Sequence, residues 1–114
     1  MNTYIESLLK FMDSSVCNFL AVDTIKKVLV ANGFVEKRLE DAFTCQAGEK
    51  FFVTKNDSAI FAVTVGSKPV SETGFKIISA HSDSPCFRIK PNPEMVSGDG
   101  LVRLNTEVYG GPIL

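Results

Sequence analysis

Apolar residues recur at helical spacing over the first 32 residues of the chain. Residues 3–12 gather apolar side chains on one face, which predicts a short amphipathic helix ended by the polar run Asp13-Ser14-Ser15. A second, stronger helix is predicted from about Asn18 to Asn32. Its apolar stripe consists of Phe19, Val22, Ile25, Val28 and Leu29.

Two details support this second helix. Asp23 stands four residues before Lys27, a spacing that favours a modest ion pair between the two side chains. Gly33 is expected to end the helix, because glycine adopts the left-handed conformation without a side-chain clash. We therefore expect the helical part of the chain to finish at this residue.

After residue 49 the pattern becomes typical of strands. The segment "KFFVTKNDSAIFAVTVG" predicts two strands joined at Asn56-Asp57, residue types that tolerate a tight turn. Its second half, Ala59 to Val65, is apolar almost without interruption, as in strands that are buried on both faces. Such burial requires helices that cover a sheet.

Three further segments complete the expected order. Gly66 to Gly74 is predicted to be a loop, and "FKIISA" a strand that leads directly to His81. Pro91 and Pro93 are expected to mark a boundary, because proline has no N–H for a strand ladder and restricts the preceding residue. After a glycine-rich turn, "SGDG", a last strand is predicted from Leu101 to Tyr109.

This order of elements predicts an α/β fold in which N-terminal helices are followed by the strands of a mixed sheet. A sheet with a doubly buried strand needs cover on both faces, and two helices can cover about one of them. The chain is therefore expected to be an incomplete part of a larger α/β domain.

The composition is that of an ordinary globular domain. The chain has 114 residues, of which 45% are apolar and 22% are charged. Its net charge is −1 with acidic and basic residues intermixed, so we expect no nucleic acid as a partner. No apolar run approaches the roughly 20 residues that span a bilayer, and the N-terminus lacks the basic start of a signal peptide. We therefore expect a cytoplasmic protein without a membrane partner.

The three cysteines, Cys17, Cys45 and Cys86, are too few and too scattered for a disulfide framework or a CxxC metal site. We expect them to be reduced and mostly buried, since free cysteine is among the most buried residue types. Cys86 follows His81 by five residues, and a Cys–His nucleophile pair at this place is a less favoured alternative.

His81 is the sole histidine and the main candidate for chemistry. Asp83 comes two positions later, and residues two apart in extended backbone share one side. A histidine that binds a metal through one ring nitrogen commonly donates its other N–H to a carboxylate, which fixes the ring. An H-x-D sequence at the carboxyl end of a strand therefore suits a metal site, because sites in open α/β sheets form there.

Taken alone, a histidine beside serine and aspartate is more often a turn residue held by hydrogen bonds than a metal ligand. One histidine cannot hold a metal ion, since zinc takes three or four protein ligands. The downstream carboxylates, Glu94, Asp99 and Glu107, include no Glu-Glu pair and come with no second histidine. The metal site therefore cannot be completed within these residues.

The wider sequence favours the metal. "ISAHSDSPCFRIKPNPE" closely resembles the His-Thr-Asp-Ser-Pro segment of the aspartyl aminopeptidase family of zinc metallopeptidases, and "NTEVYGG" resembles its Val-Glu-Val-Tyr-Gly-Gly segment. "LLKFMDSSVCNFLAVDTIKKVLVANGF" and "GEKFFVTKNDSAIFAVTVG" resemble its N-terminal helices and first hairpin, so the resemblance covers nearly the whole chain. Ser82 replaces a usual threonine, Leu20 a common histidine, and Pro112 an aliphatic residue or glycine, but none of these departures touches the H-x-D pair.

The resemblance implies a fold and an activity. Family members are several-fold longer and carry a two-metal site, usually zinc, that removes N-terminal Asp or Glu from peptides. By this resemblance His81 is a metal ligand and Asp83 orients its imidazole, while the other ligands and the catalytic glutamate lie outside these residues. Residues 1–92 then form the N-terminal portion of a zinc-peptidase-like catalytic domain, and residues 93–114 begin an inserted dimerisation domain.

By themselves these residues are expected to be an inactive N-terminal fragment. They carry one metal ligand and no general base, so we expect neither catalysis nor stable binding of the two zinc ions. An incomplete sheet exposes apolar faces and an unpaired edge, so we expect a homo-oligomer. Two alternatives stay open: a non-catalytic binding or assembly module derived from the family, and a related aminopeptidase or deacylase of the same superfamily.

Overall fold

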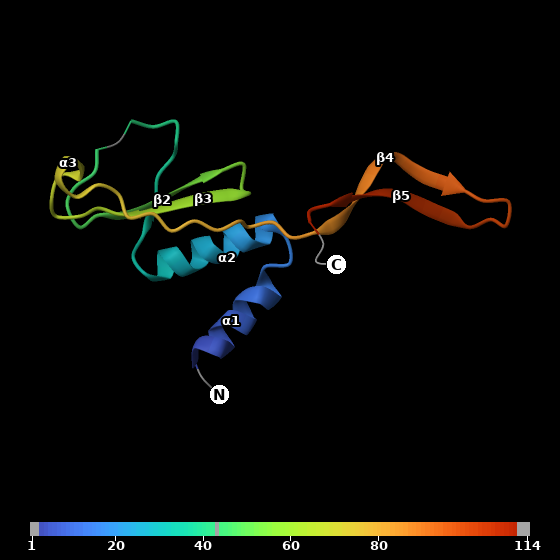
Figure 1. The fold of residues 1–114 in the computed structure, drawn as a ribbon, viewed down its shortest axis with the longest axis horizontal. Coiled ribbons are helices and arrows are strands. Elements are labelled where there is room, and N and C mark those ends of the chain that lie inside the picture. Colours follow the sequence, from blue (N-terminus) through green and yellow to red (C-terminus); the bar gives the residue numbers. More distant parts are fainter. Residues whose placement is uncertain (1–2, 43, 112–114) are drawn as a thin grey trace. The chain divides into compact units, whose positions relative to one another are not determined.

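A computed structural model describes residues 3–42 and 44–111, and Figure 1 draws its helices and strands. The chain divides into two compact units, residues 1–82 and residues 83–114. Each unit has a sheet of its own, so each is described by itself. Pro112, one of the departures from the family pattern, lies outside the described residues.

Both predicted helices are present in the first unit. Helix α1 spans Thr3–Ser14 and helix α2 spans Asn18–Ala31. Asp23 and Lys27 form the predicted ion pair, with 2.6 Å between the carboxylate Oδ2 and the ammonium Nζ. Among the described residues, no helix has the length and apolar character that crossing a membrane requires.

Gly33 ends α2 as predicted. Its φ of 78° lies in the left-handed region, and its amide donates to the carbonyl of Val30 at 3.0 Å. The next amide, that of Phe34, donates to the carbonyl of Leu29 at 3.0 Å. These two bonds form a Schellman motif, which supplies donors to carbonyls that the helix end would otherwise leave unsatisfied.

Three strands form the mixed sheet of the first unit, in the order β1-β2-β3. Strand β1 (Val35–Glu36) runs parallel to β2 (Lys50–Lys55), and β2 is antiparallel to β3 (Ala59–Thr64). Asn56 and Asp57 make the turn between β2 and β3, with φ values of 52° and 51°. Asparagine and aspartate tolerate this left-handed conformation better than most residues. The predicted α/β class, mixed sheet and hairpin are confirmed.

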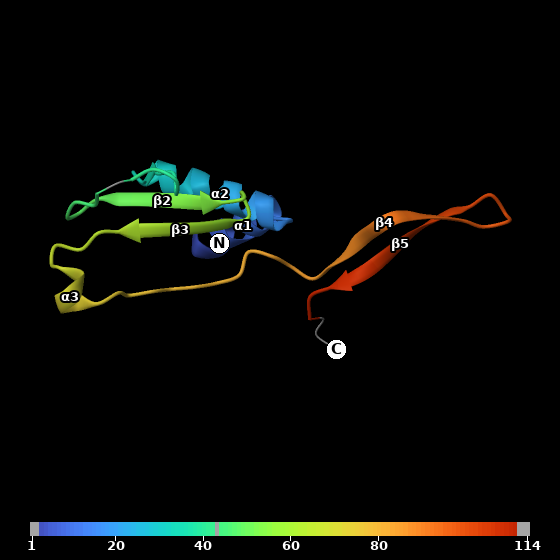
Figure 2. The same cartoon turned by 90° about the horizontal axis from the view of Figure 1, so that it is seen from above.

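The core of the first unit is built from α2 and the central strand, with α2 along the sheet (Figures 1 and 2). The buried side chains of the described residues are Ala21 and Val22 on α2 and Phe51, Phe52 and Val53 on β2. The prediction that β3 is the doubly buried strand is wrong, since Phe61 keeps 59% of its surface exposed. β3 lies at the edge of the sheet, whereas β2 has a strand on each side.

Helix α1 presents an apolar face that the described residues leave uncovered. None of its residues is buried, and five apolar side chains on it keep half or more of their surface exposed: Tyr4, Ile5, Leu8, Leu9 and Met12. The stripe on α2 is covered unevenly, since Val22 is buried while Phe19 and Val28 are exposed. Contiguous apolar surface of this kind is typical of a contact site for further protein.

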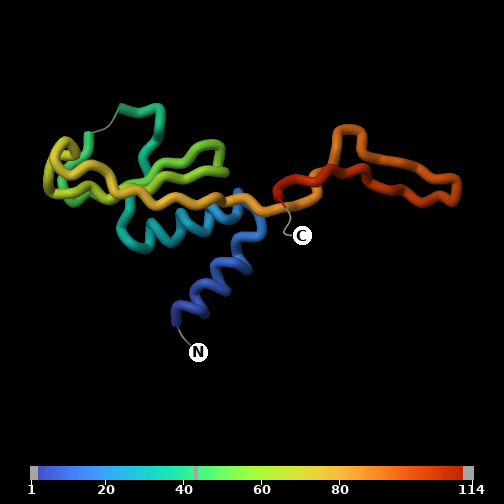
Figure 3. Tube along the Cα trace, in the orientation of Figure 1, coloured from blue at the N-terminus to red at the C-terminus, as the bar shows by residue number. Residues whose placement is uncertain are grey.

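Residues 75–80, "FKIISA", do not form the predicted strand. After β3 the chain makes the one-turn helix α3 (Val70–Thr73) inside the predicted loop and then returns as an elongated, irregular segment (Figure 3). No described segment pairs with it in a sheet, and Ile78 is fully exposed. An apolar segment becomes a strand only when a neighbouring strand pairs with its backbone N–H and C=O groups. The composition of the segment does not show whether such a neighbouring strand is present.

The second unit is a hairpin of two long strands, β4 (Cys86–Val96) and β5 (Val102–Tyr109). The predicted "SGDG" turn joins them, with Gly100 at a φ of 79° and its amide donating to the carbonyl of Ser97 at 3.0 Å. The predicted last strand is therefore confirmed. No residue of β4 or β5 is buried, so pairing of the backbones dominates the order within this unit.

Pro91 and Pro93 do not end β4, so the element boundary predicted at these prolines is wrong. The ladder is irregular here, because residues 90–93 of β4 lie opposite the single residue Asn105 of β5. Both prolines fall within this bulge, where the ladder does not need the N–H groups that they lack. Asn92 between them has a φ of 53°, which is consistent with a local excursion of the strand.

Candidate functional site

His81, the predicted metal ligand, stands at the end of the irregular segment of the first unit. The residue is exposed, so it is not a core histidine. The hydroxyl of the next residue, Ser82, donates to the carbonyl of Ser58 at 3.0 Å. Ser58 lies just before β3, so this bond anchors the backbone beside His81 to the end of the β2–β3 hairpin. The backbone beside His81 is therefore held to this hairpin.

Asp83, the residue predicted to orient His81, accepts a hydrogen bond within the second unit. The hydroxyl of Tyr109 donates to its Oδ2 at 2.6 Å, and both residues are half-buried. A hydroxyl that donates to a carboxylate makes a short, charge-assisted bond. The same carboxylate raises the pKa of Tyr109 above its ordinary value, because it stabilises the protonated phenol. Tyr109 therefore remains a donor at neutral pH.

The hairpin register brings two sequence motifs together. Cys86 pairs with Tyr109, so the end of β5 lies beside the start of β4. Gly110 has a φ of 96°, and a Cβ at this position would stand 3.0 Å from the Cα of Pro85. Glycine alone suits both this conformation and this close approach. The "EVYGG" segment is thus packed against "DSPC", although 26 residues separate Asp83 from Tyr109.

Arg88 lies over the ring of Tyr109. Its guanidinium carbon is 3.5 Å from the ring centroid, which is within the range of a cation–π contact. Arg88 comes two residues after Cys86 on β4, so it shares a side of the strand with the residue that pairs with Tyr109. Tyr109 is therefore fixed at two points, at its ring by Arg88 and at its hydroxyl by Asp83.

The described residues do not form a complete metal site. They include no group of three or more His, Cys, Asp or Glu side chains that could hold a metal ion. His81 belongs to the first unit and Asp83 to the second. Imidazole is a good zinc ligand, and a carboxylate suits its other N–H. Asp83 has acceptor capacity beyond the bond from Tyr109, since a carboxylate offers about four lone-pair positions. Each of the two side chains is thus of a type that occurs in or beside zinc sites.

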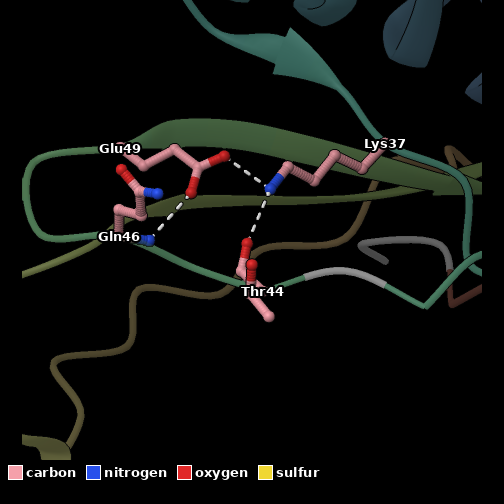
Figure 4. A network of polar contacts seen from close by, with 4 residues as sticks. All are labelled: Lys37, Thr44, Gln46 and Glu49. Atoms are coloured by element: carbon pink, nitrogen blue, oxygen red, sulfur yellow. Dashed lines mark hydrogen bonds and ion pairs between the residues drawn. The ribbon is translucent and has the colours of Figure 1, made fainter.

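A second polar cluster joins the end of β1 to the start of β2 (Figure 4). The Nζ of Lys37 lies 2.5 Å from Oε1 of Glu49 and donates to the carbonyl of Thr44 at 3.3 Å. The amide of Gln46 donates to Oε2 of Glu49 at 3.0 Å. Lys37, and then the Gln46 amide, hold the pKa of Glu49 below its ordinary value. A pocket beside the cluster is lined by Thr44, Gln46, Ala47, Gly48 and Glu49. The charges of Lys37 and Glu49 compensate each other, so this cluster stabilises the connection between β1 and β2.

The three cysteines are free, as predicted, but all three are exposed, so the prediction that they are mostly buried is wrong. Cys17 precedes α2, Cys45 lies in the connection before β2, and Cys86 begins a hairpin without buried residues. Free cysteine is buried only where the structure offers a covered position, and these three positions are exposed.

The sequence matches a known protein family, described as aminopeptidase I zinc metalloprotease (M18), over residues 11–114. The chain belongs to the M18 family. The family of zinc metallopeptidases predicted from the motifs is thereby confirmed, and the matched range includes both residues of the H-x-D pair.

Similar proteins support the M18 assignment over almost all of the chain. A probable M18 family aminopeptidase 2 from Clostridium novyi is 56% identical over 111 residues, which are 97% of this chain and 26% of that protein. The structure of an M18 family aminopeptidase from Thermotoga maritima has a TM-score of 0.79 at 28% identity, covering 95% of this chain and 23% of that one. The chain thus spans about a quarter of the length of such relatives.

The fold is also shared with a more distant protein. The mApe1 dodecamer of S. cerevisiae has a TM-score of 0.84 at 19% identity, covering 98% of this chain and 26% of that one. At this identity the similarity shows the fold alone.

Sequence reasoning selected His81 and Asp83 but gave no role to Tyr109 or Arg88. "NTEVYGG" was informative as a motif, yet the role of its tyrosine depends on the pairing between Cys86 and Tyr109. Residue spacing does not reveal such a long-range register, because two strands of this length can be aligned in several ways.

Proposed function

We propose that these residues are the N-terminal portion of a metal-dependent M18 aminopeptidase that removes N-terminal Asp or Glu from peptides. The observation that carries the proposal is the family match over residues 11–114, which contains an exposed His81 in an H-x-D sequence. The relative from Clostridium novyi is itself a probable M18 aminopeptidase. The acidic preference is supported by the resemblance of "HSDSP" and "EVYGG" to aspartyl aminopeptidases.

In this proposal each residue of the pair has one task. His81 would hold one of two zinc ions through a ring nitrogen, and Asp83 would accept the N–H of the other nitrogen and so fix the tautomer and the ring plane. When bound there, zinc would polarise the scissile carbonyl and lower the pKa of the attacking water. The chain contributes a preorganised ligand, while the remaining ligands and the general base belong to further residues of the complete enzyme.

The proposal extends to domains and assembly. Residues 1–92 belong to the catalytic domain, and residues 93–114 begin an inserted dimerisation domain. The exposed apolar surfaces of α1 and of the β4–β5 hairpin support a homo-oligomer, because apolar surface of this kind is covered in stable assemblies. These residues alone are proposed to be inactive and to bind zinc weakly, since the described part holds no three-ligand group.

The test uses the protein at its full encoded length. Release of Asp, Glu, Leu and Ala from chromogenic amides is measured with zinc, manganese or cobalt, together with the zinc content of the purified protein. We expect faster release of Asp and Glu, and His81→Ala is expected to lower kcat/KM more than about 100-fold, because a ligand matters at least as much as its hydrogen-bond partners. Lys68→Ala, in an exposed loop, is the control and should leave activity unchanged.

Three other outcomes would change the proposal. Equal release of all four residues would replace the acidic preference by a general aminopeptidase. Metal-dependent activity that survives His81→Ala would remove His81 from the site. Absence of both zinc and turnover would favour a non-catalytic binding or assembly module of the family.

A further inference from the structure

Tyr109 combines three constraints that a surface tyrosine on an uncovered hairpin does not need. Its hydroxyl lies 2.6 Å from Oδ2 of Asp83, its ring faces the guanidinium of Arg88 at 3.5 Å, and the next residue, Gly110, leaves no room for a Cβ beside Pro85. Together these contacts place the phenol within the turn that leads from Asp83 into β4.

We propose that Tyr109 is a positioning residue of the metal site, which fixes the carboxylate of Asp83 and through it the imidazole of His81. This inference rests on the function proposed above. The tyrosine touches neither metal nor substrate, and it acts through the aspartate alone. It forms a further layer behind the pair of residues that the sequence identified.

The geometry explains why a hydroxyl is useful at this place. Asp83 begins the second unit and its side chain can rotate about χ1 and χ2, so it needs a fixed partner to hold one orientation. The bond from Tyr109 engages Oδ2, and in the proposed site Oδ1 would be the oxygen that accepts an imidazole N–H. Because a charge-assisted bond is about twice as strong as a neutral one, a single hydroxyl is sufficient to select this rotamer.

Arg88 and Gly110 supply the rigidity on which this role depends. The cation–π contact fixes the plane of the ring, so the hydroxyl cannot swing away from Asp83 without losing it. Gly110 allows β5 to end against Pro85, because any Cβ would stand 3.0 Å from the Cα of that proline. The tyrosine thus keeps its distance to Asp83 even though no residue of β4 or β5 is buried.

The decisive variant is Tyr109→Phe, which removes the hydroxyl and keeps the ring under Arg88. In the protein at its full encoded length, zinc affinity is measured by competition with a chromogenic chelator, and thermal unfolding of the metal-free protein is followed in parallel. We expect zinc binding to weaken about tenfold, the lower end of the range for partners of a metal ligand, with unfolding of the metal-free protein unchanged. The visible spectrum of the cobalt-substituted protein should shift, since its bands report ligand geometry.

Two controls separate a positioning role from loss of any tyrosine hydroxyl. Tyr4→Phe, on the exposed face of α1, should leave zinc affinity unchanged. Asp83→Asn weakens zinc binding by itself, and adding Tyr109→Phe to it should have no further effect, because the hydroxyl acts only through the carboxylate. Additive losses in the double variant would overturn the inference.

Failure of this inference can be distinguished from failure of the proposed function. If His81→Ala abolishes zinc binding and Tyr109→Phe does not alter it, the function stands and the inference falls. If His81→Ala retains full zinc binding, the proposed function falls, and the inference falls with it. Should Tyr109→Phe fail to fold, Arg88→Met decides, because it frees the ring and is expected to weaken zinc binding about threefold, less than loss of the hydroxyl. Unchanged affinity in Arg88→Met would then overturn the inference.

Discussion

The two units of the chain are ordered by different means. The first unit has a small core, in which Phe52 and Val22 are almost completely buried. The second unit has no buried residue in either strand, and a pair of strands by itself is marginally stable in water. Apolar burial therefore specifies the helix–sheet unit, whereas register, a glycine contact and the polar contacts of Tyr109 specify the hairpin.

The two units also hold the two candidate site residues by different contacts. His81 follows the segment that Ser82 ties to the β2–β3 hairpin, and Asp83 is held by the strand ends of the other unit. The backbone beside His81 and the carboxylate of Asp83 are thus each held by a directional contact within their own unit. Substitutions in the core and substitutions at these contacts should therefore have distinguishable effects in experiment.

The largest effect is expected from Phe52→Ala. Phe52 has no exposed surface, so truncation leaves a cavity and should lower the free energy of unfolding by about 3–5 kcal/mol. Denaturation by urea, followed by circular dichroism on the 114-residue chain, measures the loss. Phe87→Ala is the matched control, because Phe87 is 74% exposed on β4 and should cost less than about 1 kcal/mol. Equal losses would show that the hairpin has a covered face after all.

A smaller and local effect is expected from Gly110→Ala. The new Cβ meets the backbone of Pro85 at 3.0 Å and the φ of 96° is strained for alanine, so the change should cost about 1–3 kcal/mol. Hydrogen exchange should quicken at the amides of β4 and β5 and stay unchanged at those of β2. Gly98→Ala is the control, because a Cβ at Gly98 has nothing within 4 Å. Faster exchange in both units would contradict the separation proposed here.

The smallest effect concerns Glu49 and Lys37. Lys37 lowers the pKa of Glu49, so their interaction stabilises the fold above the ordinary glutamate pKa of about 4.3 and is lost as the pH falls through the lowered value. In Lys37→Met the pKa of Glu49, followed by NMR, should return upward, and stability near pH 4 should respond less to pH. Lys10→Met, on α1, should leave this titration unchanged. If the pKa of Glu49 in Lys37→Met stayed at its value in the unsubstituted protein, the Gln46 amide alone would be responsible for the lowered pKa.

The sequence predicted those parts of the fold that depend only on the residues of one short segment. Gly33 ends α2 through its own left-handed conformation, and Asn56-Asp57 turn the chain because both residue types tolerate positive φ. The helical stripe of α2 and the alternation into β2 were visible for the same reason. None of these features requires knowledge of a distant residue.

Features that depend on residues distant in the sequence could not be predicted in the same way. Apolar content did not show that β2, rather than β3, occupies the centre of the sheet, because position depends on the neighbours of a strand. "FKIISA" has the composition of a strand but no described partner. At the candidate site, residue type identified His81 and Asp83, whereas Tyr109 came within reach only through the pairing of β4 with β5.

The bulge at residues 90–93 has a consequence for aggregation. A bare sheet edge offers a row of N–H and C=O groups on which another chain can grow as an added strand. Along β4 a regular row cannot run through the bulge, because Asn92 has a left-handed backbone. Templated growth of fibrils along this edge is therefore blocked midway, even while both faces of the hairpin stay open to specific association.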